Sequence, residues 1–192
     1  MIKEKLWIGK ELLLENYYTL FPSRKIRPMI QYLKDTGRKD LVGIEIGVAK
    51  GNNSLSILKN LPIEKLFLID PYVSFKQKGF IIKEHKSDFK IVQKKLRPYA
   101  EKVLLIHLTS SKAIKGFKKK VDFVYIDGNH EYEHINEDIV NYKKIVKKDG
   151  IIGGHDFNAK YINDVCKAVF KNFPSSYYLL HGGENDWWVT KK

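Results

Sequence analysis

Cysteine is almost missing from this sequence, which has one, Cys166, in 192 residues. A single cysteine excludes an internal disulfide and a cysteine-based metal cluster. Cys166 lies among Val165, Val169 and Phe170. We therefore expect a buried small hydrophobic residue at this position, not a nucleophile.

Long apolar runs are missing as well. No run reaches the roughly 18 residues that a membrane-spanning helix needs. Acidic residues interrupt the apolar part of the first 16 residues, and no small-residue cleavage site follows them. This pattern does not predict a signal peptide. We therefore expect a cytoplasmic protein with no membrane partner.

Negative charge is scarce, since 35 Lys and Arg stand against 22 Asp and Glu and leave a net charge of +13. Such an excess admits an anionic partner such as nucleic acid. Most of it is lysine, scattered along predicted helix faces, and there is no arginine-rich segment or RNA-binding signature. A solvated lysine surface is the favoured interpretation, and a nucleic-acid partner is the alternative. The oligomeric state is left open.

The sequence from residue 41 to residue 58 combines an apolar run, two glycines and a polar helix start. Glu45, Gly47 and Gly51 have the spacing E-x-G-x-x-x-G, and the two glycines allow a tight turn that comes close to a ligand. Asn52 or the residues after it can cap a following helix. A strand, a glycine turn and a helix N-terminus predict a ligand cradle. A tight turn without a ligand is the alternative, and the dinucleotide fingerprint G-x-G-x-x-G is not matched.

Strands and helices alternate from residue 41 onward, which predicts an α/β domain over residues 41–192. Helices separate five apolar strands, predicted at 41–46, 66–69, 103–106, 121–126 and 151–154. Such strands imply a doubly wound, mostly parallel sheet. Two further strand-like runs, 177–180 and 187–190, flank a glycine turn and predict a closing antiparallel hairpin. Residues 1–40 are predicted to be a helical extension, either a lid or a packing layer.

Ligands of parallel sheets bind at the carboxyl ends of the strands. Asp70 ends the second predicted strand, where a carboxylate can accept hydrogen bonds from the hydroxyls of a ribose. A turn aspartate before proline is the alternative. The connection 71–87 is long enough to be a candidate substrate loop.

Two motifs carry a resemblance to a known family. The E-x-G-x-x-x-G turn resembles motif I of the class I S-adenosylmethionine (SAM) methyltransferases. The segment 121–157 resembles a subfamily with the pattern Asp-Gly-x-His-x-Tyr, helix, Gly-Gly, strand, His-Asp, related to catechol-type and macrolide-sugar O-methyltransferases. This resemblance covers residues 41–192 and implies a Rossmann-like sheet of strand order 3-2-1-4-5-7-6.

The resemblance also implies site residues. SAM would be bound by residues of strands one to four and the turns after them: Glu45, Gly47, Gly51, Asp70, Ser110, Ser111 and Asp127. Ser110 and Ser111 would meet adenine, with helix caps as the alternative role. A divalent metal would be bound by Asp127, His155 and Asp156. His155 stands where relatives have a carboxylate, so manganese, iron or another transition metal is as plausible as magnesium. A polar His-Asp pair that bonds to nearby loops and binds no metal is the alternative.

His130, three residues after Asp127, is the predicted general base, because its ordinary pKa lies near neutrality. Asp127 is predicted to be catalytic with it, since a neighbouring carboxylate would hold the ring and raise its basicity. A turn histidine that caps the next helix is the alternative. The sequence therefore predicts SAM-dependent methylation of a small-molecule hydroxyl, with or without a metal. The alternatives are a nucleic-acid methyltransferase, a non-catalytic member of the fold, and a metal-dependent hydroxylase or hydrolase on the same fold.

Overall fold

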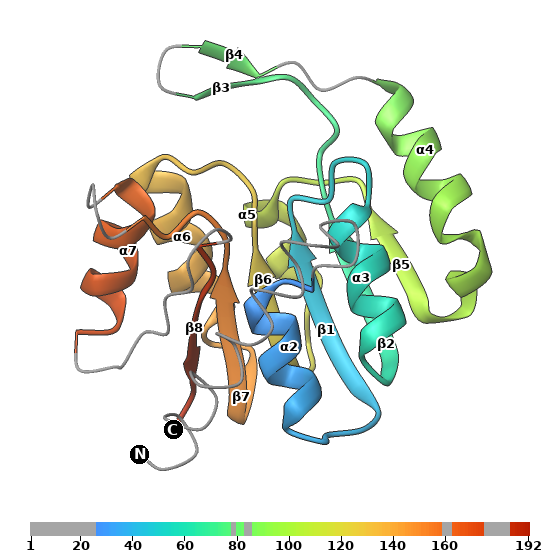
Figure 1. The fold of residues 1–192 in the computed structure, drawn as a ribbon. Coiled ribbons are helices and arrows are strands. Elements are labelled where there is room, and N and C mark those ends of the chain that lie inside the picture. The colour runs from blue at the N-terminus through green and yellow to red at the C-terminus, as the bar shows by residue number, and fades with distance from the viewer. Residues whose placement is uncertain (1–25, 78–79, 83–85, 159–162, 175–184) are drawn as a thin grey trace, which may run out of the picture.

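The computed structural model describes residues 26–77, 80–82, 86–158, 163–174 and 185–192. Its centre is a six-stranded sheet of order β5-β2-β1-β6-β7-β8 (Figure 1). The strands are β1 (Leu41–Ile46), β2 (Ile63–Ile69), β5 (Val103–Ile106), β6 (Val121–Ile126), β7 (Val146–Gly154) and β8 (Trp187–Thr190). The first five are parallel to one another, and β8 pairs antiparallel with β7.

This sheet confirms the predicted Rossmann-like fold. Numbered along the chain, its strands have the order 3-2-1-4-5-6, so the described sheet has six strands and not the predicted seven. The strand predicted over residues 177–180 lies outside the described residues. The last predicted strand is present as β8, where Trp188 and Val189 pair with Gly153 and Ile152.

Helices cover both faces of the sheet. One face packs against α2 (Pro28–Asp35), α3 (Asn52–Asn60) and α4 (Lys86–Leu96). The other packs against α5 (Ser110–Ala113), α6 (Tyr132–Tyr142) and α7 (Asp164–Asn172). Two short 3₁₀ helices, η2 (Arg97–Lys102) and η3 (Ile114–Gly116), follow α4 and α5. Within the described chain, no helix combines the length and hydrophobicity needed to cross a membrane.

The described part of the N-terminal extension is a packing layer. Met29, Ile30 and Leu33 of α2 are buried in the core on the first face of the sheet. The ring of Tyr32 lies 5.3 Å from that of Trp188 in β8. These contacts join α2 to β8.

Two predicted elements differ from the structure. The spacing of Ile135, Ile139, Tyr142 and Val146 predicts a helix over residues 132–147. The helix α6 ends at Tyr142 instead, because Val146 pairs with Val121 and begins β7. Val146 is buried in either arrangement, so hydrophobic spacing alone did not separate them. The long connection after β2 contains a small antiparallel hairpin, β3 (Phe75–Gln77) and β4 (Phe80–Ile82). This hairpin projects beyond the carboxyl ends of the strands (Figure 1).

Candidate functional site

The carboxyl ends of the parallel strands border a cavity of about 470 Å³. This volume is within the range of small-molecule sites. Four of the residues predicted to bind SAM line the cavity, namely Gly47, Asp70, Ser110 and Asp127. The structure thus gathers the ends of β1, β2, β5 and β6 around one space.

The glycine turn after β1 is shaped by contacts within the protein. Gly47 has a φ of +83°, and a Cβ added there would lie 2.1 Å from the carbonyl oxygen of Asp127. Gly51 also has a left-handed backbone, with a φ of +69°, and it is the N-cap residue of α3. The first glycine therefore lets the β1 turn and the β6 turn lie against each other.

Asp70 binds the same turn through its carboxylate. Its Oδ2 accepts hydrogen bonds from the backbone N–H groups of Val48 (2.8 Å) and Ala49 (2.9 Å). Its Oδ1 accepts one from the N–H of Tyr72 (2.7 Å). A carboxylate offers about four lone-pair sites, so about one is left for a ligand hydroxyl. Asp70 both organises the turn and lines the cavity.

Glu45 lies beneath this turn and does not line the cavity. The carboxylate accepts hydrogen bonds from Asn53 Nδ2 (3.0 Å) and from the hydroxyl of Ser54. Burial raises the pKa of Glu45 to about 7, although these two hydrogen bonds oppose the shift. Glu45 therefore fixes the first turn of α3, and its direct contact with SAM stays a prediction, as does that of Gly51.

The two predicted serines after β5 have different positions. Ser110 lines the cavity, whereas Ser111 does not. Neither is the N-cap residue of α5, which is Thr109. The side chain of Ser110 hydrogen-bonds Asp138, and burial raises the pKa of Asp138 to about 7. The roles of both serines at adenine stay predictions.

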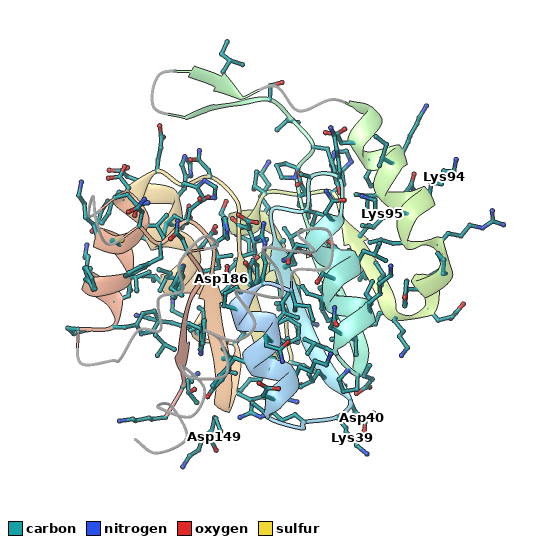
Figure 2. The ribbon with its side chains drawn as sticks, in the orientation of Figure 1. Lys39, Asp40, Lys94, Lys95, Asp149 and Asp186 are labelled. Atoms are coloured by element: carbon teal, nitrogen blue, oxygen red, sulfur yellow. The ribbon has the colours of Figure 1, made fainter. Side chains whose placement is uncertain are left out.

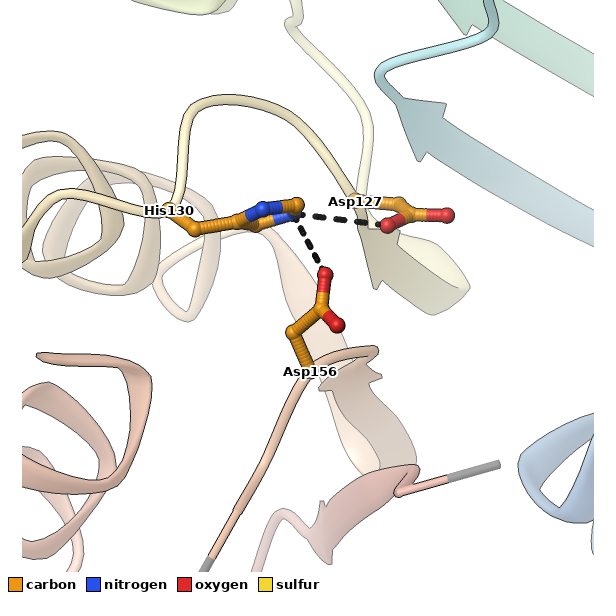
Figure 3. A group of neighbouring side chains, drawn as sticks. All are labelled: Asp127, His130 and Asp156. Carbon is orange, nitrogen blue, oxygen red and sulfur yellow. Dashed lines mark ion pairs between the residues drawn. The ribbon is translucent and has the colours of Figure 1, made fainter. Parts of the chain in front are cut away.

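His130 lies between two carboxylates at the ends of β6 and β7 (Figure 3). Its Nε2 is 3.5 Å from Asp127 Oδ1 and 3.2 Å from Asp156 Oδ2. These are ion-pair distances, but the angles do not meet hydrogen-bond geometry within the described chain. Ligand atoms of all three residues lie within 4.8 Å of one another, which is close enough for one metal ion.

His155 also lies near the two carboxylates with which it is predicted to bind a metal, and that role stays a prediction. Its Nδ1 lies 3.4 Å from Asp156 Oδ1 and 3.9 Å from Asp127 Oδ1. Burial lowers its pKa, but the hydrogen bond to Asp156 and the nearby carboxylates outweigh this effect and raise it. The predicted ligands Asp127, His155 and Asp156 lie together, yet the converging set contains His130 in place of His155.

Arg27 is a site residue that the sequence did not predict. Its Nη1 donates a hydrogen bond to Asp127 Oδ2 (2.6 Å) and another to the hydroxyl of Tyr125 (2.8 Å). The Tyr125 hydroxyl donates in turn to Asp186 Oδ1 (2.7 Å), whose Oδ2 accepts from the N–H of Met29 (3.1 Å). Burial raises the pKa of Asp186 to about 7. Asp186 lies in the middle of the molecule (Figure 2), so this chain of contacts joins the core to the site.

Several cavity residues also escaped prediction. Asn129, His134 and Asp138 line the cavity, and His134 is an exposed residue of α6. One signal was available for Asp138, because it lies on the same helical face as Ile135, Ile139 and Tyr142. A carboxylate on the apolar face of a helix needs a buried partner. No comparable signal marks Arg27, whose partner is 100 residues away.

Comparisons with known proteins agree with this arrangement. A family model described as a methyltransferase domain matches residues 44–157. An uncharacterised protein of Acanthamoeba polyphaga mimivirus, R132, is 28% identical over 151 residues, which cover 74% of this chain and 64% of that protein. The chain thus spans somewhat less than two thirds of the length of this relative.

Solved structures share the fold at low identity. A precorrin-6y C5,15-methyltransferase from Geobacter metallireducens is 13% identical with a TM-score of 0.61, covering 85% of this chain and 87% of its own. An rRNA methylase from Streptococcus thermophilus is 8% identical with a TM-score of 0.61, covering 85% and 95%. A Streptococcus mutans protein in complex with SAH is 12% identical with a TM-score of 0.60, covering 84% and 93%.

Proposed function

Because this chain belongs to the methyltransferase-domain family, we propose that it transfers the methyl group of SAM to a hydroxyl of a small molecule. One observation supports a hydroxyl group as the methyl acceptor. The ring of His130 lies between Asp127 and Asp156, close to the cavity that contains Gly47, Asp70 and Ser110. A methyl donor and a proton acceptor would therefore meet at the ends of β6 and β7.

The cavity would hold the methyl donor. When bound, SAM supplies an electrophilic methyl carbon on a sulfonium centre. The remaining lone pair of Asp70 would accept a hydrogen bond from a ribose hydroxyl. Ser110, held by Asp138, would border the base of the nucleoside. The backbone turn at Gly47 would leave space for the donor beside β1.

His130 would accept the proton of the acceptor. The acceptor oxygen would take the methyl group that bound SAM supplies, and S-adenosylhomocysteine would leave with the electron pair of the broken bond. The hydroxyl proton moves to Nε2 of His130, which becomes positively charged. Asp127 and Asp156 stabilise that charge, since each has a carboxylate oxygen within 3.5 Å of Nε2. Such general-base help is typically worth about 10²–10⁴-fold in rate.

A divalent metal is the alternative way to activate the hydroxyl. Asp127, His130 and Asp156 offer two oxygen ligands and one nitrogen, a donor set that suits manganese, iron or another transition metal better than magnesium. A bound metal would lower the pKa of the acceptor hydroxyl. His130 would then be a ligand and could not accept the proton. The two mechanisms therefore exclude each other, and metal assistance stays a prediction.

An RNA acceptor is the second candidate, supported by the net charge of +13. Phosphate binding by lysines would make the affinity fall steeply as salt rises. Binding of a single-stranded RNA would be measured at several salt concentrations. A flat salt response or no binding would eliminate this candidate.

Two measurements test the main proposal. Calorimetry with SAM and with S-adenosylhomocysteine should show saturable binding to the intact protein. A library of hydroxylated small molecules, assayed by release of S-adenosylhomocysteine, should then contain a methyl acceptor. No binding of either ligand would refute the proposal at its first step. Binding without transfer to any hydroxyl would refute the choice of acceptor and favour a non-catalytic role.

A further inference from the structure

A second concave surface lies away from the cofactor cavity, on the sheet face that packs against α5, α6 and α7. It is a groove of about 700 Å³, lined by residues of β1, β2, β5, the β5–β6 connection and the first residues of β6 and β7. The apolar residues that form its floor are Val42, Phe67, Leu104, Ile106, Leu108 and Phe117. We call it the β5 groove. None of the residues proposed to act on SAM or the acceptor lines it.

The β5 groove exists because the connection from β5 to β6 contains little helix. This connection has only the four-residue α5 and the three-residue η3, whereas α6 has 11 residues and α7 has nine. The two longer helices cover the sheet over β6 and β7. A single short turn cannot cover β5 and β2, so Leu104 is 47% exposed and Leu108 is 45% exposed. Contiguous exposed apolar surface of this kind marks interaction sites.

Lysines surround this apolar floor. The groove is lined by Lys65, Lys112, Lys118, Lys119, Lys120 and Lys147, and no Asp or Glu is among the described residues that line it. Lys147 pairs with Asp122 at 2.9 Å, and Lys65 donates to the carbonyl of Glu101. The other four make no ion pair or hydrogen bond through their side chains in the described chain. The rim therefore has uncompensated positive charge next to an open apolar surface.

The apolar floor and the lysine rim together indicate which class of partner can bind in the β5 groove. A second copy of the chain would bring another net charge of +13 against the same lysines, which disfavours self-association. Single-stranded RNA would need open aromatic faces on which bases stack. The two aromatic residues of the floor pack edge to face with each other, with ring centroids 5.1 Å apart, and the exposed large apolar residues of the lining are leucines. Arginine is also missing from the described lining.

We propose that the β5 groove docks a segment of a partner protein that combines apolar side chains with Asp or Glu. The apolar side chains would cover Leu104 and Leu108, and the carboxylates would pair with the lysines at 118–120. Apolar burial would provide the affinity, and the charges would provide specificity and speed of association. This proposal does not depend on the methyl acceptor.

The experiment is a selection of short peptides from a displayed library on the full-length protein, followed by fluorescence anisotropy with the enriched peptides. Enriched sequences should combine leucine, isoleucine or aromatic residues with Asp and Glu. The triple variant K118E/K119E/K120E and the variant L104E should each weaken binding by about tenfold or more. L108E, outside the strand, provides a second apolar test if L104E fails to fold. Native folding of each variant is checked by its thermal melting curve.

A matched control makes the same change of charge elsewhere. Lys59 of α3 and Lys90 and Lys94 of α4 are exposed and belong to helices on the opposite face of the sheet. The variant K59E/K90E/K94E should leave peptide affinity within about twofold, because distant charges are screened. Enriched peptides without acidic residues, equal weakening by the control variant, or no enrichment over an unrelated protein would overturn the proposal. Groove-dependent binding of single-stranded RNA or anionic vesicles in place of acidic peptides would also overturn it.

Discussion

Arg27 and Asp127 lie 100 residues apart in the chain and form a contact of 2.6 Å between Nη1 and Oδ2. Arg27 comes just before α2, and Asp127 comes directly after β6. Because the guanidinium binds Oδ2, the other oxygen of Asp127, Oδ1, faces His130 and His155. The N-terminal segment thereby sets which oxygen of the carboxylate faces the proposed acceptor site.

Replacing Arg27 should therefore impair catalysis more than cofactor binding. In R27A, Asp127 loses a charged partner and can rotate, so we expect kcat/KM to fall by about 10–100-fold, the usual effect of removing such a partner. SAM affinity, measured by calorimetry, should change little. R27K restores the charge without the planar guanidinium and should recover part of the loss. Unchanged kcat/KM in R27A would remove Arg27 from the catalytic arrangement.

Local patterns in the sequence predicted most of the fold. The turn after β1 and the aspartates that end β2 and β6 could be placed because each follows a short apolar run directly. Parallel strands bring their carboxyl ends to one edge, so this placement also predicted which side chains meet. The sequence could not show that the carboxylate of Asp70 accepts hydrogen bonds from two N–H groups of the glycine turn. A hydrogen bond from the backbone to a side chain does not require a recognisable pattern of residues.

Long-range contacts explain which features of the site the sequence did not predict. Arg27 has no motif around it, and its role depends on how α2 packs against β8 and the sheet. The exchange of His130 for His155 in the converging cluster has a similar cause. His155 and Asp156 are adjacent, and Asp156 has a φ of +60°, so the backbone turns sharply after β7. Sequence spacing gives no information on such a turn at a residue other than glycine.

Gly47 should tolerate alanine far less well than Gly37 does. Both have a left-handed backbone, with φ of +83° and +67°. A Cβ at Gly47 would lie 2.1 Å from the carbonyl oxygen of Asp127, whereas nothing lies within 4 Å of a Cβ at Gly37. We expect G37A to lower the free energy of unfolding by about 1–2 kcal/mol and G47A by about 2–5 kcal/mol. Urea unfolding of both variants measures the difference, and equal losses would contradict the contact between the two turns.

The buried carboxyl of Glu45 should make stability depend on pH. Burial raises its pKa from 4.5 to about 7, so the folded protein retains a proton that the unfolded chain releases. Stability from this group is complete below pH 4.5 and is lost as pH rises through about 7. Urea midpoints should therefore fall over this range in the native protein and fall less steeply in E45Q, which has no proton to lose. Parallel pH profiles for the two proteins would show that Glu45 does not titrate there.

The choice between a base and a metal ligand at His130 can be decided with two histidine variants and a chelator. If His130 is the base, H130Q should lose about 10²–10⁴-fold in kcat while it still binds SAM. H155Q is the matched control, because His155 contacts the same two carboxylates from Nδ1 without belonging to the converging cluster, and it should lose much less. Dialysis against a chelator should leave the native rate unchanged. Loss of activity on chelation, restored by manganese in the native protein and not in H130Q, would instead make His130 a metal ligand.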